Sequence, residues 1–275
     1  MNIDTSPNIT SRNRPAKQQG VAISVRGLSK SFDGAPVLRG LSFEIAPGEI
    51  FVIMGPSGAG KTVLLNHLIG LLEPDHGEVR INGMSPTSRN LHDKIRMAMV
   101  FQNSGLLNSL SVEENVSLYL TEHRLKPWQQ IRQIVREQLE HLNLSRADAA
   151  KYPFELSGGM KKRVAIARAI VMEPRVILYD EPTAELDPVM ARTVVNEIRR
   201  ARALLSQTSV LVTHDRELAF EIADRIAILL DGSLLKIGTP AEIKSYQSSE
   251  RKEDAALRNF LTANYKNNET KSDYE

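Results

Sequence analysis

The sequence contains no cysteine, so it cannot form a disulfide framework, use a thiol nucleophile, or hold zinc or an iron–sulfur cluster on thiolates. It has no apolar run of about 18 residues, and no segment is therefore predicted to cross a bilayer. Neither sign of charge dominates, because 35 basic and 33 acidic side chains give a formal net charge of +2. That balance argues against nucleic acid as a partner. Hydrophobic residues make up 41% of the 275, which excludes a wholly disordered chain and suffices for a buried core.

The pattern of apolar residues divides the chain into three parts. Residues 1–20 are polar and lack an apolar segment, so we expect a disordered tail without a secretory signal. Residues 21–245 alternate short apolar runs with amphipathic stretches, which predicts a mainly parallel sheet flanked by helices. Within this α/β domain, the part from about 105 to 165 is mostly helical in pattern and is predicted to be an insertion. Residues 246–275 are predicted to form a C-terminal extension with a short amphipathic helix at Ala256–Leu261.

Individual elements follow from the spacing of apolar residues. Alternation between Ile23 and Ile45 predicts half-buried antiparallel strands. The run Ile50–Met54 is continuous and predicts a strand buried on both faces, and a stripe of leucines predicts a helix at Thr62–Leu72. Further along the chain, the same reasoning predicts buried strands at Val176–Tyr179 and Val210–Val212 and a helix at Pro188–Leu205.

Between the first buried strand and the first helix, the sequence fits the phosphate-binding pattern G-x-x-x-x-G-K-[ST] at every fixed position. Glycines let the backbone curl so that N–H groups point at phosphate oxygens, and the following helix adds its positive N-terminal end. Lys61 supplies a positive charge for the β- and γ-phosphates, and Thr62 offers a hydroxyl to Mg²⁺. A chance match in a glycine-containing loop is the alternative, but the pattern sits where the mechanism requires it. The predicted nucleotide-binding residues here are Gly55, Pro56, Ser57, Gly58, Ala59, Gly60, Lys61, Thr62 and Val63.

A pair of carboxylates ends the predicted strand at Val176–Tyr179. Asp180, at the strand end, is placed to hold Mg²⁺ through its water shell. Glu181 follows directly and can act as a general base that polarises a water against the γ-phosphate. Taken alone, the pair would be interpreted as surface acids, but downstream of a phosphate-binding loop the catalytic interpretation is preferred.

The string Leu-Ser-Gly-Gly-Met at residues 156–160 resembles the signature motif of the ATP-binding cassette (ABC) family. Ser157, Gly158 and Gly159 stand at the start of a helical stretch, so they are predicted to form a second anion-binding helix end. The resemblance implies that this end contacts the γ-phosphate held by a second ATPase subunit. Two ATP molecules would then lie between two domains in a head-to-tail dimer.

Four further positions match motifs of the same family in the expected order. Phe32 resembles the aromatic residue that stacks on adenine, and Gln102 resembles the glutamine that senses Mg²⁺ and the attacking water. Ala184–Asp187 resembles the D-loop, and His214 resembles the switch histidine that contacts the γ-phosphate. Singly, Phe32 would be interpreted as a core residue and Gln102 as a surface residue, but their order around the phosphate-binding loop favours the family. The resemblance implies that Glu181, His214 and Gln102 are catalytic and that Thr62, Gln102 and Asp180 hold Mg²⁺.

The resemblance implies an ABC-type P-loop NTPase domain at residues 21–245, with an antiparallel β subdomain and a helical subdomain that carries the signature. Such a chain is expected to be an ATPase, the ATP-hydrolysing subunit of a transporter, with ATP and Mg²⁺ as its ligands. Its expected partners are integral-membrane permease subunits, because this sequence has no predicted spanning segment of its own. The expected location is the cytoplasmic face of the inner membrane.

Met160 restricts the resemblance to one part of the family, because most cassettes carry Gln at this position of the signature. The form L-S-G-G-M-x-x-R and the string Ala256–Leu261 are similar to the ATPase subunits of Mla/MCE-type phospholipid transporters. So is the stretch that consists of Phe101–Leu107, Ser111–Val116 and the pair Glu122-His123. This implies phospholipid as the cargo and an MCE-domain lipid-binding protein as a further partner. The alternatives are an amino-acid or other solute importer, and a soluble ABC ATPase without a transport role. The signature and the absence of an N-K-x-D string argue against a P-loop kinase or GTPase.

Overall fold

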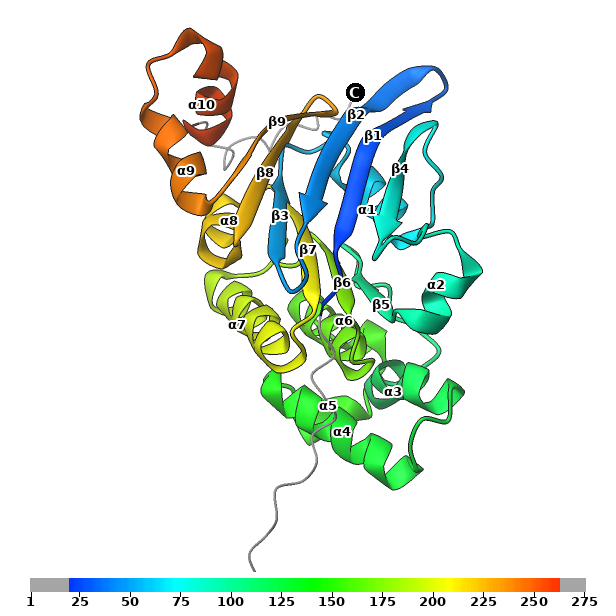
Figure 1. Cartoon of the computed structure of the whole chain (residues 1–275). Helices are drawn as coiled ribbons and strands as arrows, with labels where there is room; N and C mark the ends of the chain where they lie inside the picture. Colours follow the sequence, from blue (N-terminus) through cyan, green and yellow to red (C-terminus); the bar gives the residue numbers. More distant parts are fainter. Residues whose placement is uncertain (1–19, 263–275) are drawn as a thin grey trace, which may run out of the picture.

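A computed structural model describes residues 20–262, and its centre is a six-stranded sheet (Figure 1). The strand order is β5-β6-β7-β3-β8-β9, and every neighbouring pair is parallel except β8 and β9. The strands are β3 (Ile50–Met54), β5 (Met97–Val100), β6 (Val176–Asp180), β7 (Thr208–Thr213), β8 (Arg225–Leu230) and β9 (Ser233–Gly238). Strands β3, β6 and β7 are buried along their whole length, which confirms the interpretation of the continuous apolar runs.

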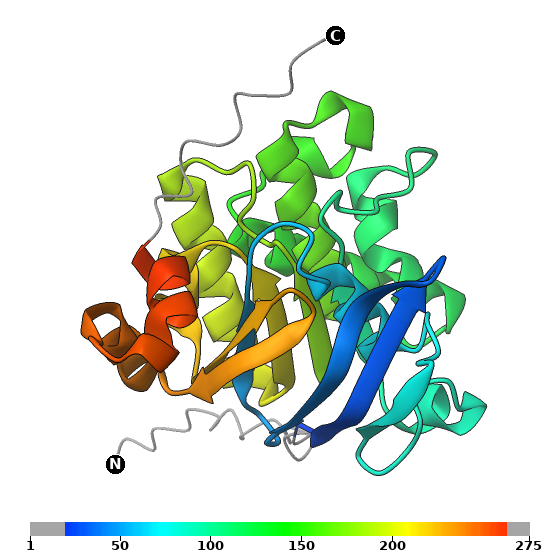
Figure 2. The same cartoon turned by 90° about the horizontal axis from the view of Figure 1, so that it is seen from above.

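A second, smaller sheet is antiparallel, with the strand order β2-β1-β4. It consists of β1 (Ile23–Phe32), β2 (Ala35–Ile45) and β4 (His76–Ile81). Buried and exposed residues alternate along the second half of β2, as predicted for a half-buried strand. Seen from above, the blue strands of this sheet lie at one side of the molecule and the green helices lie at the other (Figure 2).

Helices cover the central sheet and form a further layer beyond it (Figure 1). They are α1 (Lys61–Ile69), α2 (Arg89–Lys94), α3 (Val112–Glu122), α4 (Trp128–His141), α5 (Arg146–Ala149), α6 (Gly158–Val171), α7 (Pro188–Leu205), α8 (Arg216–Ile222), α9 (Pro240–Ser245) and α10 (Ala255–Thr262). Single 3-10 turns lie at Pro153–Glu155, Tyr246–Ser248 and Lys252–Asp254. Helices α3, α4, α5 and the start of α6 make up the part that was predicted to be a helical insertion.

Strand β3 separates two hydrophobic clusters. Ile50, Val52 and Met54 join the cluster that includes the buried residues of α3, α4 and α6, whereas Phe51 and Ile53 join the cluster shared with α1 and the antiparallel sheet. Successive residues of a strand point to opposite faces, so close packing holds β3 from both sides. The loop that follows Met54 therefore starts from a fixed point.

Helix α1 is shorter than its leucine stripe predicts. It ends at Ile69 rather than at Leu72, because Gly70 adopts a left-handed φ of 85° and its N–H returns to carbonyls of the last turn. A glycine in this conformation ends a helix regardless of the apolar periodicity beyond it. The prediction of the helix was right in kind and wrong at its end.

The domain begins before its predicted boundary at residue 21. Gly20, which was assigned to the tail, is buried, and its N–H donates to the carbonyl of Ser206 at 2.8 Å. The domain therefore includes Gly20, and the rest of the predicted tail, residues 1–19, lies outside the described residues. In residues 20–262 we find no helix with the length and apolar character needed to span a membrane.

The predicted C-terminal helix is present as α10 and packs on its own domain. Leu257, Phe260 and Leu261 are buried in the cluster that also holds the core of α6. Ala256, predicted for the same stripe, is exposed, because it lies at the edge of the buried face, about 100° around the helix from Leu257 and about 140° from Leu261. Arg216, at the start of α8, donates to the carbonyl of Leu261. Residues 263–275 of the predicted extension lie outside the described residues.

The burial of α10 leads to a stability prediction. Phe260→Ala is expected to lower the free energy of unfolding by about 3 kcal/mol, since it removes a buried aromatic ring and leaves a cavity. Urea denaturation followed by circular dichroism measures the change. Ala256→Ser is the matched control and is expected to shift stability by less than about 0.5 kcal/mol, because Ala256 is exposed. Equal stability of the two variants would show that α10 does not pack on the domain.

Candidate active site

The predicted phosphate-binding loop joins β3 to α1 with the backbone conformation that its glycines allow. Gly58 and Gly60 have φ values of 79° and 95°, in the left-handed region that glycine adopts without strain. A Cβ at Gly60 would also lie 2.7 Å from the Leu38 Cδ2 atom. Gly60 precedes α1 and has no side chain that could cap it, which leaves the first N–H groups of α1 available to an anion.

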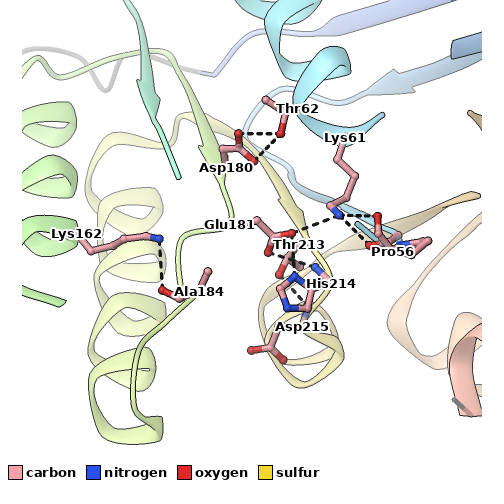
Figure 3. Close-up of polar contacts among 11 residues, drawn as sticks. Pro56, Lys61, Thr62, Lys162, Asp180, Glu181, Ala184, Thr213, His214 and Asp215 are labelled. Carbon is pink, nitrogen blue, oxygen red and sulfur yellow. Dashed lines mark hydrogen bonds and ion pairs between the residues drawn. The ribbon is translucent and has the colours of Figure 1, made fainter. Parts of the chain in front are cut away.

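Lys61 is surrounded by oxygen atoms (Figure 3). Its Nζ donates to the carbonyl oxygens of Gly55 at 2.9 Å and Pro56 at 3.0 Å, and lies 3.3 Å from Oε1 of Glu181. The side chain is only 7% exposed. A buried ammonium group needs such partners, and phosphate oxygens that enter the loop would compete for the same proton donors.

Thr62 and Asp180 bring an alcohol and a carboxylate together. The Thr62 hydroxyl donates to Asp180, with distances of 3.0 and 3.2 Å to the two carboxylate oxygens. Burial raises the pKa of Asp180, and the hydrogen bond from Thr62 opposes that shift. Among residues 20–262 no group of three or more His, Asp or Glu side chains could hold a metal ion. The oxygen donors of Thr62 and Asp180 fit Mg²⁺, which takes one or two protein oxygens together with phosphates and water.

Glu181 is held in place from two sides. Its backbone has a left-handed φ of 46°, and its N–H donates to the carbonyl of Val212 on β7 at 3.0 Å. Its carboxylate accepts a hydrogen bond from the backbone N–H of His214 at 3.3 Å and lies 3.0 Å from the His214 Nδ1 atom. Figure 3 shows the Glu181 carboxylate between Lys61 and His214. A fixed, buried carboxylate that faces a pocket is suited to accept a proton.

One pocket, with a volume of about 410 Å³, collects most of the predicted site. Its lining comprises Val37, Ser57, Gly58, Gly60, Lys61, Thr62, Val63, Gln102, Glu181, Ala184, Glu185 and His214. The structure therefore brings together residues from the phosphate-binding loop, the ends of β5, β6 and β7, and the loop after β6. Asp180 joins this group through Thr62.

Besides Gly55, Pro56, Ala59 and Asp180, two sets of predicted residues are not part of this lining. Phe32 lies at the end of β1, is 41% exposed, and has the Lys30 ammonium 5.6 Å from its ring centroid. Ser157, Gly158 and Gly159 lie at the start of α6, where Ser157 and Gly158 are exposed and the Ser157 hydroxyl accepts the N–H of Met160 at 3.3 Å. The role of Phe32 with adenine and the contact of the α6 end with a second subunit stay predictions.

Two residues of this region, Val37 and Lys162, were not predicted to belong to the site, and Ala184 and Glu185 were predicted only as members of the D-loop string. Val37 lines the pocket from β2, but an apolar residue in a strand carries no sign of such a role. Glu185 lies in the D-loop string and could have been singled out there. Lys162 is buried next to the site, although the basic string that contains it is typical of a solvated helix surface.

A family model described as "ABC transporter" matches residues 38–184, more than half of the chain. A probable ribonucleotide transport ATP-binding protein of Mycobacterium leprae is 37% identical over 228 residues, which are 82% of this chain and 65% of that protein. A sulfate/thiosulfate import ATP-binding protein of Caulobacter vibrioides is 37% identical over 225 residues, which are 81% and 66% of the two chains. The chain thus spans just under two thirds of the length of these relatives.

A solved structure shows the same fold. The ATP-binding cassette MJ0796, described as a dimer in a post-hydrolysis state bound to ADP and Pi, superposes with a TM-score of 0.73. Its sequence is 30% identical, and the match covers 79% of this chain and 98% of that chain.

Proposed function

This chain belongs to the ABC transporter family, and from that premise we propose that it binds and hydrolyses ATP to drive a transport system. The observation that supports this most strongly is the convergence of Lys61, Glu181 and His214 in one pocket at the end of the phosphate-binding loop. Three residues far apart in the sequence provide a cation for phosphate, a carboxylate for a water, and a histidine that holds the carboxylate.

ATP binding is proposed to use the residues of the loop. Backbone N–H groups of Gly58 and Gly60 and of the first turn of α1 would surround the β- and γ-phosphates. Lys61 would transfer its hydrogen bonds from the loop carbonyls and Glu181 to phosphate oxygens. Thr62, Asp180 and Gln102 would hold Mg²⁺, which supplies charge neutralisation of the phosphates. Phe32 is proposed to stack on the adenine outside the phosphate pocket.

Hydrolysis is proposed to depend on Glu181. The carboxylate orients a water and takes its proton as the water oxygen bonds to the γ-phosphorus and the bond to the bridging oxygen breaks. His214, which is 3.0 Å from Glu181, keeps the carboxylate oriented and, from its place in the pocket lining, donates to the γ-phosphate. Gln102 from the end of β5 faces the same pocket and is proposed to position the water.

A second copy of the chain is proposed to complete the site. The exposed start of α6 with Ser157, Gly158 and Gly159 does not line its own pocket, so its N–H groups are available to the ATP of a partner. Head-to-tail association would place each signature against the other subunit's γ-phosphate. The dimeric description of the cassette with the same fold supports this arrangement.

The proposed partners are permease subunits of the inner membrane, with this chain peripheral on the cytoplasmic face. The proposed cargo is phospholipid, supplied through an MCE-domain protein, on the basis of Met160 and the two other similar segments. A solute importer is the second candidate, because two relatives are named for ribonucleotide and for sulfate or thiosulfate. ABC ATPases without a transport role form a third class.

Purification from membranes of the native host tests these proposals. The tagged chain is solubilised in detergent, and co-purifying proteins and lipids are identified by mass spectrometry, with the Lys61→Ala variant as a parallel sample. We expect a multi-span permease, an MCE-domain protein and bound phospholipid. Recovery of a permease with a solute-binding protein would mean that the cargo is a solute and not phospholipid. Recovery without any membrane protein would overturn the transport role.

A further inference from the structure

Lys162 is a buried cation that contacts two separate loops of the proposed active site. It lies on α6, is 4% exposed, and its Nζ donates to the carbonyl oxygens of Gln102 at 3.1 Å and Ala184 at 3.4 Å. Figure 3 shows the side chain extending from α6 to Ala184. Gln102 follows β5 and Ala184 follows β6, so one ammonium group joins three elements that are distant in the sequence.

The surroundings of Lys162 balance the cost of burying its charge. Burial lowers the pKa of Lys162, and the nearby carboxylates of Glu185, Glu181 and Asp180 oppose that shift. Two carbonyl oxygens then satisfy N–H donors that water would otherwise bind. An apolar residue of similar length could fill this space without the cost of desolvation, so the position of the charge, rather than packing, is what the ammonium group contributes.

A second cation of α6, Arg168, binds the loop that contains Gln102. Arg168 donates to the carbonyls of Gly105 at 2.8 Å and Ser104 at 3.2 Å. The segment from Gln102 to Gly105 is therefore attached to α6 at two points, six residues and less than two turns apart on the helix. Only the first of these attachments, Lys162, also reaches the loop after β6.

The start of α6 is also close to the loop after β6. A Cβ placed on Gly159 would lie 3.2 Å from the Leu186 Cδ2 atom. The start of α6, which carries the signature motif, therefore packs closely against the residues that follow Ala184. Gln102 and Ala184 line the nucleotide pocket, whereas Ser157 and Gly158 lie exposed at the helix end outside it. Lys162 thus stands between the pocket and the exposed helix end.

We propose that Lys162 is a positioning residue that couples the nucleotide pocket to the exposed start of α6 through its bonds to Gln102 and Ala184. When the loops with these two residues shift around a bound γ-phosphate, the ammonium group carries α6 with them. Ser157, Gly158 and Gly159 are then presented to the second copy only when the pocket is filled. This inference rests on the proposed function, since it assumes that the pocket binds ATP.

Lys162→Met in the full chain tests the coupling, because it removes both hydrogen bonds and keeps the length of the side chain. We expect the ATP affinity to stay within about twofold, the turnover rate to fall about tenfold or more, and ATP-dependent dimerisation in the Glu181→Gln background to be lost. Amide hydrogen exchange at residues 157–161 should respond to ATP in the parent chain and not in the variant. Lys162→Arg keeps both the charge and the donors, so it should recover most of the exchange response.

Lys161→Met is the matched control. Lys161 precedes Lys162 on the same helix, and its side chain forms no hydrogen bond or ion pair with another described residue, so its loss should leave turnover unchanged. A Lys162→Met variant with parental turnover and exchange response would overturn the proposal, as would an equal effect of Lys161→Met. A parallel fall of ATP affinity and turnover in Lys162→Met and Lys162→Arg would also overturn it, because that pattern indicates collapse of the pocket. Failure of the parent chain to bind ATP would instead refute the proposed function.

Discussion

Replacing Glu181 by Gln is expected to reduce ATP turnover by about a hundredfold to ten-thousandfold, the usual contribution of a general base. The amide keeps the size of the side chain and an acceptor for the His214 N–H, but it cannot take a proton from water. ATP binding is expected to persist or to tighten, because the change removes a negative charge 3.3 Å from the Lys61 Nζ atom. Phosphate release gives the turnover rate, and equilibrium dialysis with labelled ATP gives the affinity.

The same variant should accumulate as a closed dimer. If two copies associate only around the γ-phosphate, a chain that binds ATP without cleaving it stays in the associated state. Light scattering with ATP and Mg²⁺ should then report twice the mass found without nucleotide. Glu137→Gln, an exposed change on α4, is the control and should behave as the parent chain. Parental turnover in Glu181→Gln would remove Glu181 from the role of base.

The backbone at Glu181 shows why this position is suited to its proposed role. Its φ of 46° is unusual for a residue with a side chain and costs on the order of 1 kcal/mol or more. The bond from its N–H to Val212 and the two contacts with His214 hold it there. Chain direction changes at the end of β6, so Asp180 faces Thr62 while the next side chain faces Lys61. The sequence pattern predicts two adjacent acids but not that they diverge to different partners.

Much of the fold could be predicted from local signals. The ABC-type fold, with a mainly parallel sheet and a smaller antiparallel one, is confirmed. Helix α7 begins and ends where predicted, because Asp187 accepts the N–H groups of Val189 and Met190 and Ser206 ends the helix in a left-handed conformation. Its polar and apolar residues recur with the helical period, so the local signals and the tertiary packing agree.

Other features depend on tertiary contacts that the sequence does not reveal. The early end of α1 results from Gly70, whose conformation overrides the leucine periodicity. Lys162 stands in the basic string Lys161–Arg163 and is buried only because two distant loops bring carbonyl oxygens to it. Most residues of the pocket lining could be predicted from the order of the motifs. Val37 could not, because it reaches the pocket only through the pairing of β2 with β1.

Replacing Lys61 by Ala is expected to weaken ATP binding by about thirtyfold or more. Hydrogen bonds to a charged group contribute about 1.5–3 kcal/mol each, and about 1.4 kcal/mol corresponds to a factor of ten in affinity. Equilibrium dialysis measures the loss, and Lys94→Ala, an exposed change on α2, is the control. Full binding by Lys61→Ala would show that the interpretation of the phosphate-binding loop is wrong.

A double variant separates two contributions of Lys61. The ammonium group attracts phosphate, and it also neutralises the buried carboxylate of Glu181, which is 3.3 Å away. In Lys61→Ala the unpaired carboxylate repels the γ-phosphate, so Lys61→Ala with Glu181→Gln should bind ATP more tightly than Lys61→Ala alone. The difference between this gain and the effect of Glu181→Gln in the parent chain measures the coupling between the two side chains. A coupling of zero would mean that Glu181 faces the phosphates independently of Lys61, and the contact between these two side chains would then have no role in binding.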